Sequence, residues 1–227
     1  MIDYEEKVFS IKKVILNLYI MKFEFEYRYY GYDKSSVLNK IKDLNGVNVN
    51  PSRIIKNIVL RNKTKMLHRL RTEDDTNYLY TQKIQNFKKF DKEIEMRIVN
   101  TDEKTILEMF RNTKLYEKYR VEKMREKWII PYNNTNVEVV FDIYPGTPEY
   151  CEIEAKTLED LENLEKELNL KDFRFKGGMK HLMKKVFGIN YNKIDFKDNM
   201  NNITFKNIEV LKEKVLKNQD KFKEMFL

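Results

Sequence analysis

Short stretches along this chain alternate strictly between apolar and charged residues. Two of them, Phe23-Glu24-Phe25-Glu26-Tyr27-Arg28-Tyr29 and Cys151-Glu152-Ile153-Glu154-Ala155-Lys156, each carry two acids and then a base at every second position. A β-strand sends successive side chains to opposite faces, so the charged residues share one face and the apolar residues the other. Further strands are predicted over residues 52–60, 66–72, 77–84, 92–99, 116–130 and 137–143.

Between these strands the apolar positions change to helical spacing. This predicts helices over residues 33–44, 101–110 and 157–168, with Asp33 or Ser35, Thr101 and Thr157 as their N-caps. Asn45-Gly46 is expected to end the first of them. Two more helices are predicted over residues 179–186 and about 207–225. The chain is therefore of the α+β class, with amphipathic helices covering the apolar side of an antiparallel sheet.

The charged side of the sheet is compatible with two architectures. In an open sheet the charges face water while the helices pack behind. In a closed barrel the charges line the lumen and the helices cover the apolar exterior. A lumen of acids and bases is costly unless it holds water, a metal or a charged ligand.

Composition limits the possibilities further. The 227 residues suffice for one large domain or a domain with an appendage, and the net charge of +8 permits a polyanionic ligand without requiring one. The single cysteine, Cys151, excludes an intrachain disulfide and is expected in the core. No apolar run approaches the roughly 20 residues of a membrane helix, and residues 14–20 lack a signal-peptide cleavage site. We expect a cytoplasmic protein without a membrane partner.

The charged residues themselves indicate a chemistry. Paired carboxylates without histidine or cysteine are hard oxygen ligands that suit Mg²⁺ or Mn²⁺. Arginine and lysine on the same surface suit a phosphate chain. Metal and basic groups together stabilise the charge that develops in phosphoryl transfer. No phosphate-binding loop of the Walker type is present, because Gly177-Gly178-Met179-Lys180 lacks the spacing.

The order of the charged motifs resembles that of a known family. Glu24-Phe25-Glu26-Tyr27-Arg28 resembles the ExExK signature of the CYTH superfamily, the triphosphate tunnel metalloenzymes. The later motifs follow in the order of that family over roughly residues 22–170: Arg69-Leu70-Arg71, Lys83, Glu93-Ile94-Glu95-Met96-Arg97, Lys118-Tyr119-Arg120, Val140-Phe141-Asp142 and Cys151-Glu152-Ile153-Glu154.

The resemblance implies a closed eight-stranded antiparallel β-barrel, a tunnel with a charged lumen and an apolar exterior covered by helices. Residues 21–227 would form this single domain, C-terminal helices included, after an N-terminal extension over residues 1–20. The implied metal ligands are Glu24, Glu26, Asp142, Glu152 and Glu154, with Glu93 and Glu95 completing a second metal site or orienting a water. The implied substrate-binding residues are Arg28, Arg69, Arg71, Lys83, Arg97, Lys118, Arg120 and Lys156.

Glu24, Glu26 and Arg28 would be the catalytic group. Arg28 stands where the family usually has lysine. Because arginine does not readily lose its proton, this position is expected to bind phosphate and not to transfer protons.

Three functions follow from the resemblance and the charges. The first is hydrolysis of a triphosphate with Mg²⁺ or Mn²⁺, the substrate being inorganic triphosphate, thiamine triphosphate, a nucleoside triphosphate or the 5′-triphosphate end of RNA. The second is a class IV-type adenylyl cyclase, although Met21-Lys22-Phe23 replaces the His-Phe pair that often leads the signature there. The third is a non-catalytic module that binds polyphosphate or RNA ends, which needs the bases but not the acids.

Overall fold

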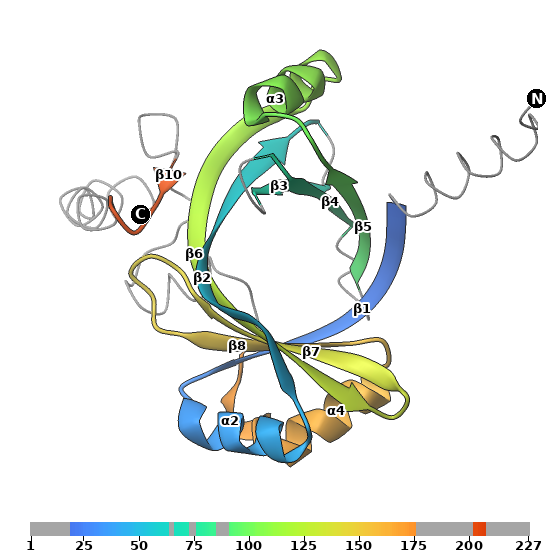
Figure 1. Ribbon diagram of the computed structural model, residues 1–227, viewed down its shortest axis with the longest axis vertical. Coiled ribbons are helices and arrows are strands. Elements are labelled where there is room, and N and C mark those ends of the chain that lie inside the picture. The colour runs from blue at the N-terminus through green and yellow to red at the C-terminus, as the bar shows by residue number, and fades with distance from the viewer. Residues whose placement is uncertain (1–18, 64–65, 73–75, 85–90, 176–201, 208–227) are drawn as a thin grey trace, which may run out of the picture. The chain divides into compact units, whose positions relative to one another are not determined.

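The computed structural model describes residues 19–63, 66–72, 76–84, 91–175 and 202–207 (Figure 1). Residues 1–18 of the expected N-terminal extension lie outside this part of the chain, whereas residues 19 and 20 already begin the first strand. The predicted helix over residues 179–186 and the predicted C-terminal helix beyond residue 207 also lie outside it.

The described elements are strands and three α-helices, with one short 3₁₀ helix over Lys171–Phe173. The strands are β1 (Tyr19–Tyr30), β2 (Val47–Arg61), β3 (Leu67–Thr72), β4 (Tyr78–Ile84), β5 (Asp91–Ile98), β6 (Tyr116–Tyr132), β7 (Thr135–Ile143), β8 (Tyr150–Ala155), β9 (Arg174–Phe175) and β10 (Asn202–Ile203). The helices are α2 (Lys34–Asp43), α3 (Glu103–Asn112) and α4 (Leu158–Glu167). Hydrogen-bonded neighbours follow the order β10-β6-β2-β3-β4-β5-β1-β8-β7, with β9 beside β1 and a further pairing of β6 with β7.

The chain divides into two compact units. Unit 1 contains the chain up to Glu24 together with residues 57–118, and unit 2 contains residues 25–56 together with the chain from Tyr119 onward. The division falls within β1, β2 and β6, so each of these strands contributes to both units.

Unit 1 contains an antiparallel arrangement of β3, β4, β5 and the first half of β1. The register pairs Arg69 with Thr81, Lys83 with Glu93, and Glu24 with Asp91. The charged site residues predicted on β3 to β5 therefore share one face of the sheet. The other face packs into an apolar cluster with α3, made of Ile58, Leu60, Leu70, Tyr78, Ile106 and Leu115, with Tyr80, Ile98, Leu107 and Phe110 packed against it.

Unit 2 contains β7, β8, the second half of β1 and most of β6, with α2 and α4 against one face of the sheet (Figure 1). The register pairs Glu26 with Glu154 and Glu138 with Glu154, so three acids lie side by side across β1, β8 and β7. The face opposite these acids, against which α2 and α4 pack, forms the larger apolar core. Its members include Tyr29, Ile41, Trp128, Phe141, Cys151, Ile153, Leu161 and Leu164.

The helix starts follow mostly from local capping residues. Asp33 accepts hydrogen bonds from Ser35 N and Ser36 N at the start of α2, and Thr157 accepts one from Asp160 N at the start of α4, as predicted. For α3 the predicted cap, Thr101, is wrong. Asp102 accepts from Thr105 N there, because the carboxylate is one residue closer to the first helical turn.

The end of α2 uses Asn45 and Gly46 for different reasons. Asn45 adopts the left-handed conformation, with φ 59°. Gly46 is needed for space, because a Cβ atom there would lie 2.5 Å from Ile41 Cγ2 and 2.7 Å from Ile41 O. The predicted helix stop is confirmed, with asparagine supplying the unusual backbone angle.

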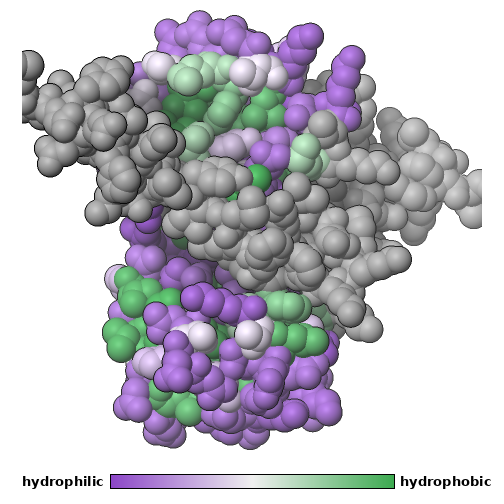
Figure 2. Space-filling model, turned by 90° about the vertical axis from the view of Figure 1, so that its right-hand side faces the viewer, coloured by the Kyte–Doolittle hydropathy of each residue, from purple (hydrophilic) through white to green (hydrophobic). Residues whose placement is uncertain are grey.

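The α+β class, the mostly antiparallel sheet and the covering of its apolar face by helices are confirmed. The closed eight-stranded barrel stays a prediction. On the side of the molecule in Figure 2, hydrophilic residues dominate the coloured surface, with smaller hydrophobic areas between them. None of the helices described has both the length and the apolar character needed to cross a membrane.

Candidate functional site

The side chains on the charged face of unit 2 form rows across neighbouring strands. Across β1, β8 and β7 one row contains Glu26, Glu154 and Glu138. In the next row Arg28 lies opposite Glu152. A third row places Tyr30 opposite Tyr150, Tyr150 opposite Asp142, and Asp142 opposite Arg125 on β6. Along the strands the face therefore changes from acidic to mixed charge, and in the third row tyrosines join Asp142 and Arg125.

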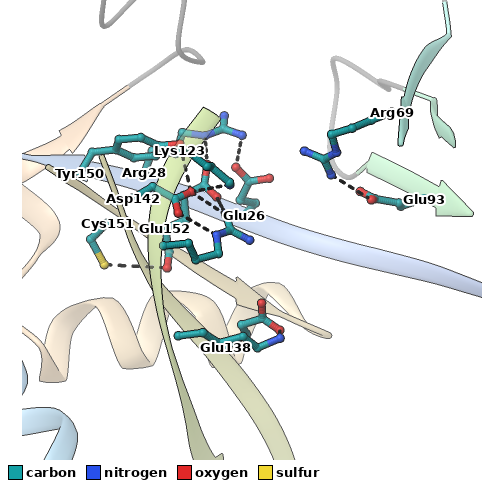
Figure 3. A network of polar contacts seen from close by, with 12 residues as sticks. Glu26, Arg28, Arg69, Glu93, Lys123, Glu138, Asp142, Tyr150, Cys151 and Glu152 are labelled. Atoms are coloured by element: carbon teal, nitrogen blue, oxygen red, sulfur yellow. Dashed lines mark hydrogen bonds and ion pairs between the residues drawn. The ribbon is translucent and has the colours of Figure 1, made fainter. Parts of the chain in front are cut away.

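Asp142 is the centre of the mixed-charge part (Figure 3). It is fully buried and accepts three short hydrogen bonds from cations: Lys123 Nζ to Oδ2 at 2.7 Å, Arg125 Nε to Oδ1 at 2.7 Å and Arg125 Nη2 to Oδ2 at 2.6 Å. The Tyr150 hydroxyl donates a longer hydrogen bond of 3.3 Å to Oδ2. The bidentate arginine contact fixes the orientation of the carboxylate.

Glu152 connects this centre to β1. Its Oε1 accepts from Arg28 Nε at 2.7 Å and its Oε2 accepts from Arg125 Nη2 at 3.2 Å. Arg28 also forms an ion pair with Glu26. Arg28 and Glu152, both predicted from the sequence, are thus in direct contact, and Asp142 and Glu152 share Arg125.

The charges of this network depend on one another because burial opposes ionisation. Burial alone would raise the pKa of Asp142, but Arg125 and Lys123 outweigh it and lower the pKa below its usual value. Burial would also raise the pKa of Glu152, but Arg28, Lys123 and Arg125 outweigh burial and lower this pKa. Burial would lower the pKa of Arg28, whereas Glu152 and Glu26 raise it. All these groups are therefore ionised at neutral pH.

In the acidic row, Glu26 pairs with Arg28 and Glu138 pairs with Lys127. Glu138 Oε2 lies 2.5 Å from Lys127 Nζ, and both side chains are about a quarter exposed. Glu154 lies between Glu26 and Glu138 in the register. Like charges directly opposite each other on neighbouring strands destabilise a sheet. A cation among these three acids would relieve that repulsion.

The donor set of this face suits a hard divalent cation. Glu26, Glu152 and Glu154 offer carboxylate oxygens and no nitrogen or sulfur, which is the ligand chemistry that Mg²⁺ and Mn²⁺ prefer. Within the described ranges, however, no three histidine, cysteine, aspartate or glutamate side chains already form a group that could hold a metal. Arg28, Lys123 and Arg125 occupy carboxylate oxygens instead, so metal binding would require these ion pairs to rearrange.

Unit 1 has its own charged face around Glu93. Arg69 Nη2 lies 3.5 Å from Glu93 Oε1 (Figure 3). Lys83 Nζ lies 3.7 Å from Glu93 Oε2. Arg69 Nε also donates to Thr81 Oγ1 at 3.3 Å. Glu95 and Arg97 follow at alternate positions of β5, and Arg71 follows Arg69 on β3. The sequence prediction that these residues share a face with Glu93 agrees with the register.

Several predicted site residues lie apart from these two clusters. Lys156 is exposed and follows the last residue of β8. Lys118 is exposed and belongs to unit 1. Arg120 is an odd number of residues from both Lys123 and Arg125, so strand alternation places it on the other face of β6. Glu24 is not one of these residues: its backbone pairs with Asp91, two positions along β1 from the pairing of Lys22 with Glu93.

Sequence reasoning missed the main cations of unit 2. Lys123-Met124-Arg125 has the same spacing as Lys118-Tyr119-Arg120 and lies five residues further along the same strand. The signal that could have found it is the distance to the hairpin, since pairing backward from the turn at residues 133 and 134 places Arg125 opposite Asp142. Neither Glu138 nor Tyr150 was among the site residues predicted from the sequence.

Cys151 lies on the apolar face, as predicted. Its side chain is fully buried in the core cluster of unit 2, and burial raises the pKa of the thiol well above its usual value. A neutral, buried thiol is a packing residue and not a nucleophile.

Comparison with solved structures gives the fold an independent basis. A protein of Vibrio parahaemolyticus, named as a candidate adenylate cyclase, is 14% identical with a TM-score of 0.57, and the match covers 72% of this chain and 98% of that chain. The PH1012 protein of Pyrococcus horikoshii is 17% identical with a TM-score of 0.54 and coverage of 70% and 98%. HpAC1 from Hippeastrum, named as a candidate adenylyl cyclase with a dominant triphosphatase activity, is 12% identical with a TM-score of 0.50 and coverage of 72% and 95%.

No protein-family model and no curated protein sequence matches the chain. The likeness is therefore one of fold, spread over nearly the whole of each solved structure. The chain thus shares its fold with proteins named as candidate adenylate cyclases, one of them described as having triphosphatase activity, and the comparison shows the fold alone.

Proposed function

We propose that this chain hydrolyses the terminal phosphate of a triphosphate with the help of Mg²⁺ or Mn²⁺. The observation that carries the proposal is the buried face of unit 2, where Asp142 and Glu152 are held among Arg28, Lys123 and Arg125. Buried ion pairs of this kind are often no more stabilising than apolar residues of similar volume, so their presence here fits a role in binding. A fold shared with a protein that is described as having triphosphatase activity supports the same conclusion.

The basic side chains would hold the phosphate chain. Arg28 and Arg125 present guanidinium groups that already grip carboxylates, and the same geometry grips phosphate oxygens. Lys123 adds a compact charge beside Arg125. The predicted phosphate ligands Arg69, Arg71 and Lys83 form a second basic set on the face of unit 1, with Arg97 following on β5.

The acidic side chains would hold the metal. Glu26, Glu152 and Glu154 are the proposed ligands, with Glu24 and Asp142 as the further ligands that the resemblance implies. Glu138 adds a carboxylate to the same row. The bound cation would polarise the terminal phosphoryl group and lower the pKa of water. The carboxylates also keep the arginines ionised and oriented when no substrate is bound.

The reaction itself is a displacement at phosphorus. A water oxygen bonds to the terminal phosphorus while the bond from that phosphorus to the bridging oxygen breaks. The bridging oxygen leaves with the diphosphate portion, and the water gives up one proton as orthophosphate forms. Arg28, Lys123 and Arg125 would offset the negative charge that gathers on the phosphate oxygens. Glu93 and Glu95 remain the predicted residues for orienting a water or for a second metal.

The direct test is phosphate release from tripolyphosphate, thiamine triphosphate, ATP and 5′-triphosphate RNA, each with Mg²⁺ or Mn²⁺. We expect release from at least one substrate, its loss on addition of EDTA and its return with excess metal. Glu152→Gln should remove the activity. Glu159→Gln, which changes an exposed acid in the first turn of α4, should retain it.

The same assay distinguishes the alternatives. Cyclic AMP and diphosphate from ATP, in place of orthophosphate, would establish the cyclase reaction that the names of two fold relatives suggest. A binding module would show affinity for tripolyphosphate that survives the double change Glu26→Gln and Glu154→Gln, with no turnover. Absence of phosphate release from every substrate, over a range of metals and pH, would refute hydrolysis.

A further inference from the structure

The aromatic end of the charged face in unit 2 has a construction of its own. Tyr144 and Tyr150 stack with ring centroids 5.9 Å apart and planes 7° from parallel. Such a separation is within the range of offset aromatic stacking. Tyr150 is buried, whereas Tyr144 is partly exposed.

A tight turn fixes the position of Tyr144. Thr147 N donates to Tyr144 O at 2.9 Å, and Pro145 and Gly146 occupy the two central positions of the turn, with φ 75° at Gly146. Proline followed by a glycine of positive φ is the signature of a type II turn. The Thr147 hydroxyl also accepts from Tyr144 N at 3.1 Å and donates to Tyr144 O at 3.0 Å. A ring on so constrained a backbone loses little freedom when a ligand packs against it.

The stacked pair adjoins the cations proposed to bind phosphate. Lys123 Nζ lies 5.8 Å from the centroid of the Tyr144 ring and 2.7 Å from Asp142 Oδ2. The Tyr150 hydroxyl donates to the same carboxylate oxygen. When the phosphate of a ligand contacts Lys123, the group attached to that phosphate can therefore reach the rigid aromatic surface of Tyr144.

We propose that Tyr144, supported from behind by Tyr150, is a stacking platform for a planar ring on the substrate. The inference rests on the proposed triphosphate hydrolysis and specifies its substrate class: a triphosphate that carries an aromatic ring, such as a nucleoside triphosphate, in preference to inorganic tripolyphosphate. Every base has a π face, so the platform selects for a ring and not for a particular base. Tyr144 is thus a specificity residue that contacts a part of the substrate away from the reacting phosphorus.

The test compares kcat/KM for ATP with kcat/KM for tripolyphosphate in the same preparations. Tyr144→Ala should lower the ratio of the two about tenfold, the order of magnitude expected for one lost stacking contact. The loss should appear mainly as a higher KM for ATP. Tyr144→Phe, which keeps the ring, should restore the ratio. Tyr116→Ala removes an exposed tyrosine at the start of β6 in unit 1 and serves as the control.

Each outcome bears on the proposal. An unchanged ratio in Tyr144→Ala, or an equal loss for both substrates, would overturn it, since equal losses mark a merely structural role for the ring. Should wild-type protein release phosphate from none of the four triphosphates named above, the proposed hydrolysis fails separately. Calorimetric binding of a non-hydrolysable ATP analogue and of tripolyphosphate then decides: Tyr144→Ala must weaken binding of the analogue alone, and any other pattern refutes the platform.

Discussion

The charged faces of the two units are built from the same strand alternation, yet they differ in how their charges are paired. In unit 2, Asp142 has no exposed surface and receives contacts of 2.6 to 2.7 Å from Lys123 and Arg125. In unit 1, Glu93 is 5% exposed and its ion pairs with Arg69 and Lys83 measure 3.5 and 3.7 Å.

The difference separates two uses of charge. A short, buried and bidentate contact orients its partners, and loss of one partner leaves an uncompensated charge in a poorly hydrated place. A longer ion pair with partly exposed cations stabilises little, and an incoming phosphate can replace it at small cost. The face of unit 2 is therefore expected to be important for stability as well as for chemistry, and that of unit 1 mainly for ligand affinity.

The largest effect should come from changing the central acid of each face. Asp142→Asn leaves Lys123 and Arg125 buried without their counter-charge, and we expect a loss of about 3–5 kcal/mol in the free energy of unfolding. The matched change Glu93→Gln should cost about 1 kcal/mol or less, because water can reach Arg69 and Lys83. Urea unfolding followed by circular dichroism measures both. Equal losses in the two variants would contradict the distinction between the faces.

A smaller effect, on activity, should separate the two basic pairs of β6. Arg125→Lys keeps the charge but loses the bidentate contact with Asp142, so kcat/KM for the preferred triphosphate should fall roughly a hundredfold. Arg120→Lys is the matched control on the opposite face of the strand and should change kcat/KM less than about threefold. If Arg120→Lys proves the more damaging change, the sequence-based assignment of Lys118 and Arg120 is the correct one.

This ambiguity shows where sequence reasoning ends. Alternation alone located the charged strands, and capping residues located the starts of α2 and α4, because both are local properties. The choice between Lys118-Tyr119-Arg120 and Lys123-Met124-Arg125 is not local, since it depends on which residue pairs with Asp142 across the hairpin. The Tyr144 and Tyr150 stack is hidden for a related reason, since it requires the turn and the β7–β8 register together.

The smallest effect should be a difference in pH response between the units. Burial lowers the pKa of His68, whose Nδ1 lies 2.7 Å from the Tyr80 hydroxyl in unit 1. As the pH falls, this histidine takes up its proton at a higher pH in the unfolded chain than in the folded chain. The free energy of unfolding therefore decreases below about pH 6.5. The lowered pKa values of Asp142 and Glu152 act only at strongly acidic pH, because their stabilisation persists above the unfolded values of about 4.

Thermal unfolding between pH 7 and pH 5 checks this order. The midpoint of the wild-type protein should decrease with pH more steeply than that of His68→Gln, which carries no titrating group at this position. Parallel curves for wild type and His68→Gln would show that the buried imidazole has no influence on stability in this range.

The sharing of β1, β2 and β6 between the units has a consequence for how the chain reaches its structure. The backbone passes from one unit to the other three times, so neither unit is a continuous stretch that could be excised and expressed alone. The contact between Arg28 and Glu152 closes a span of 124 residues. Such distant pairings make folding slow compared with that of helical proteins of similar stability. During synthesis on the ribosome, the second half of β1 must wait for β8 until most of the chain has emerged.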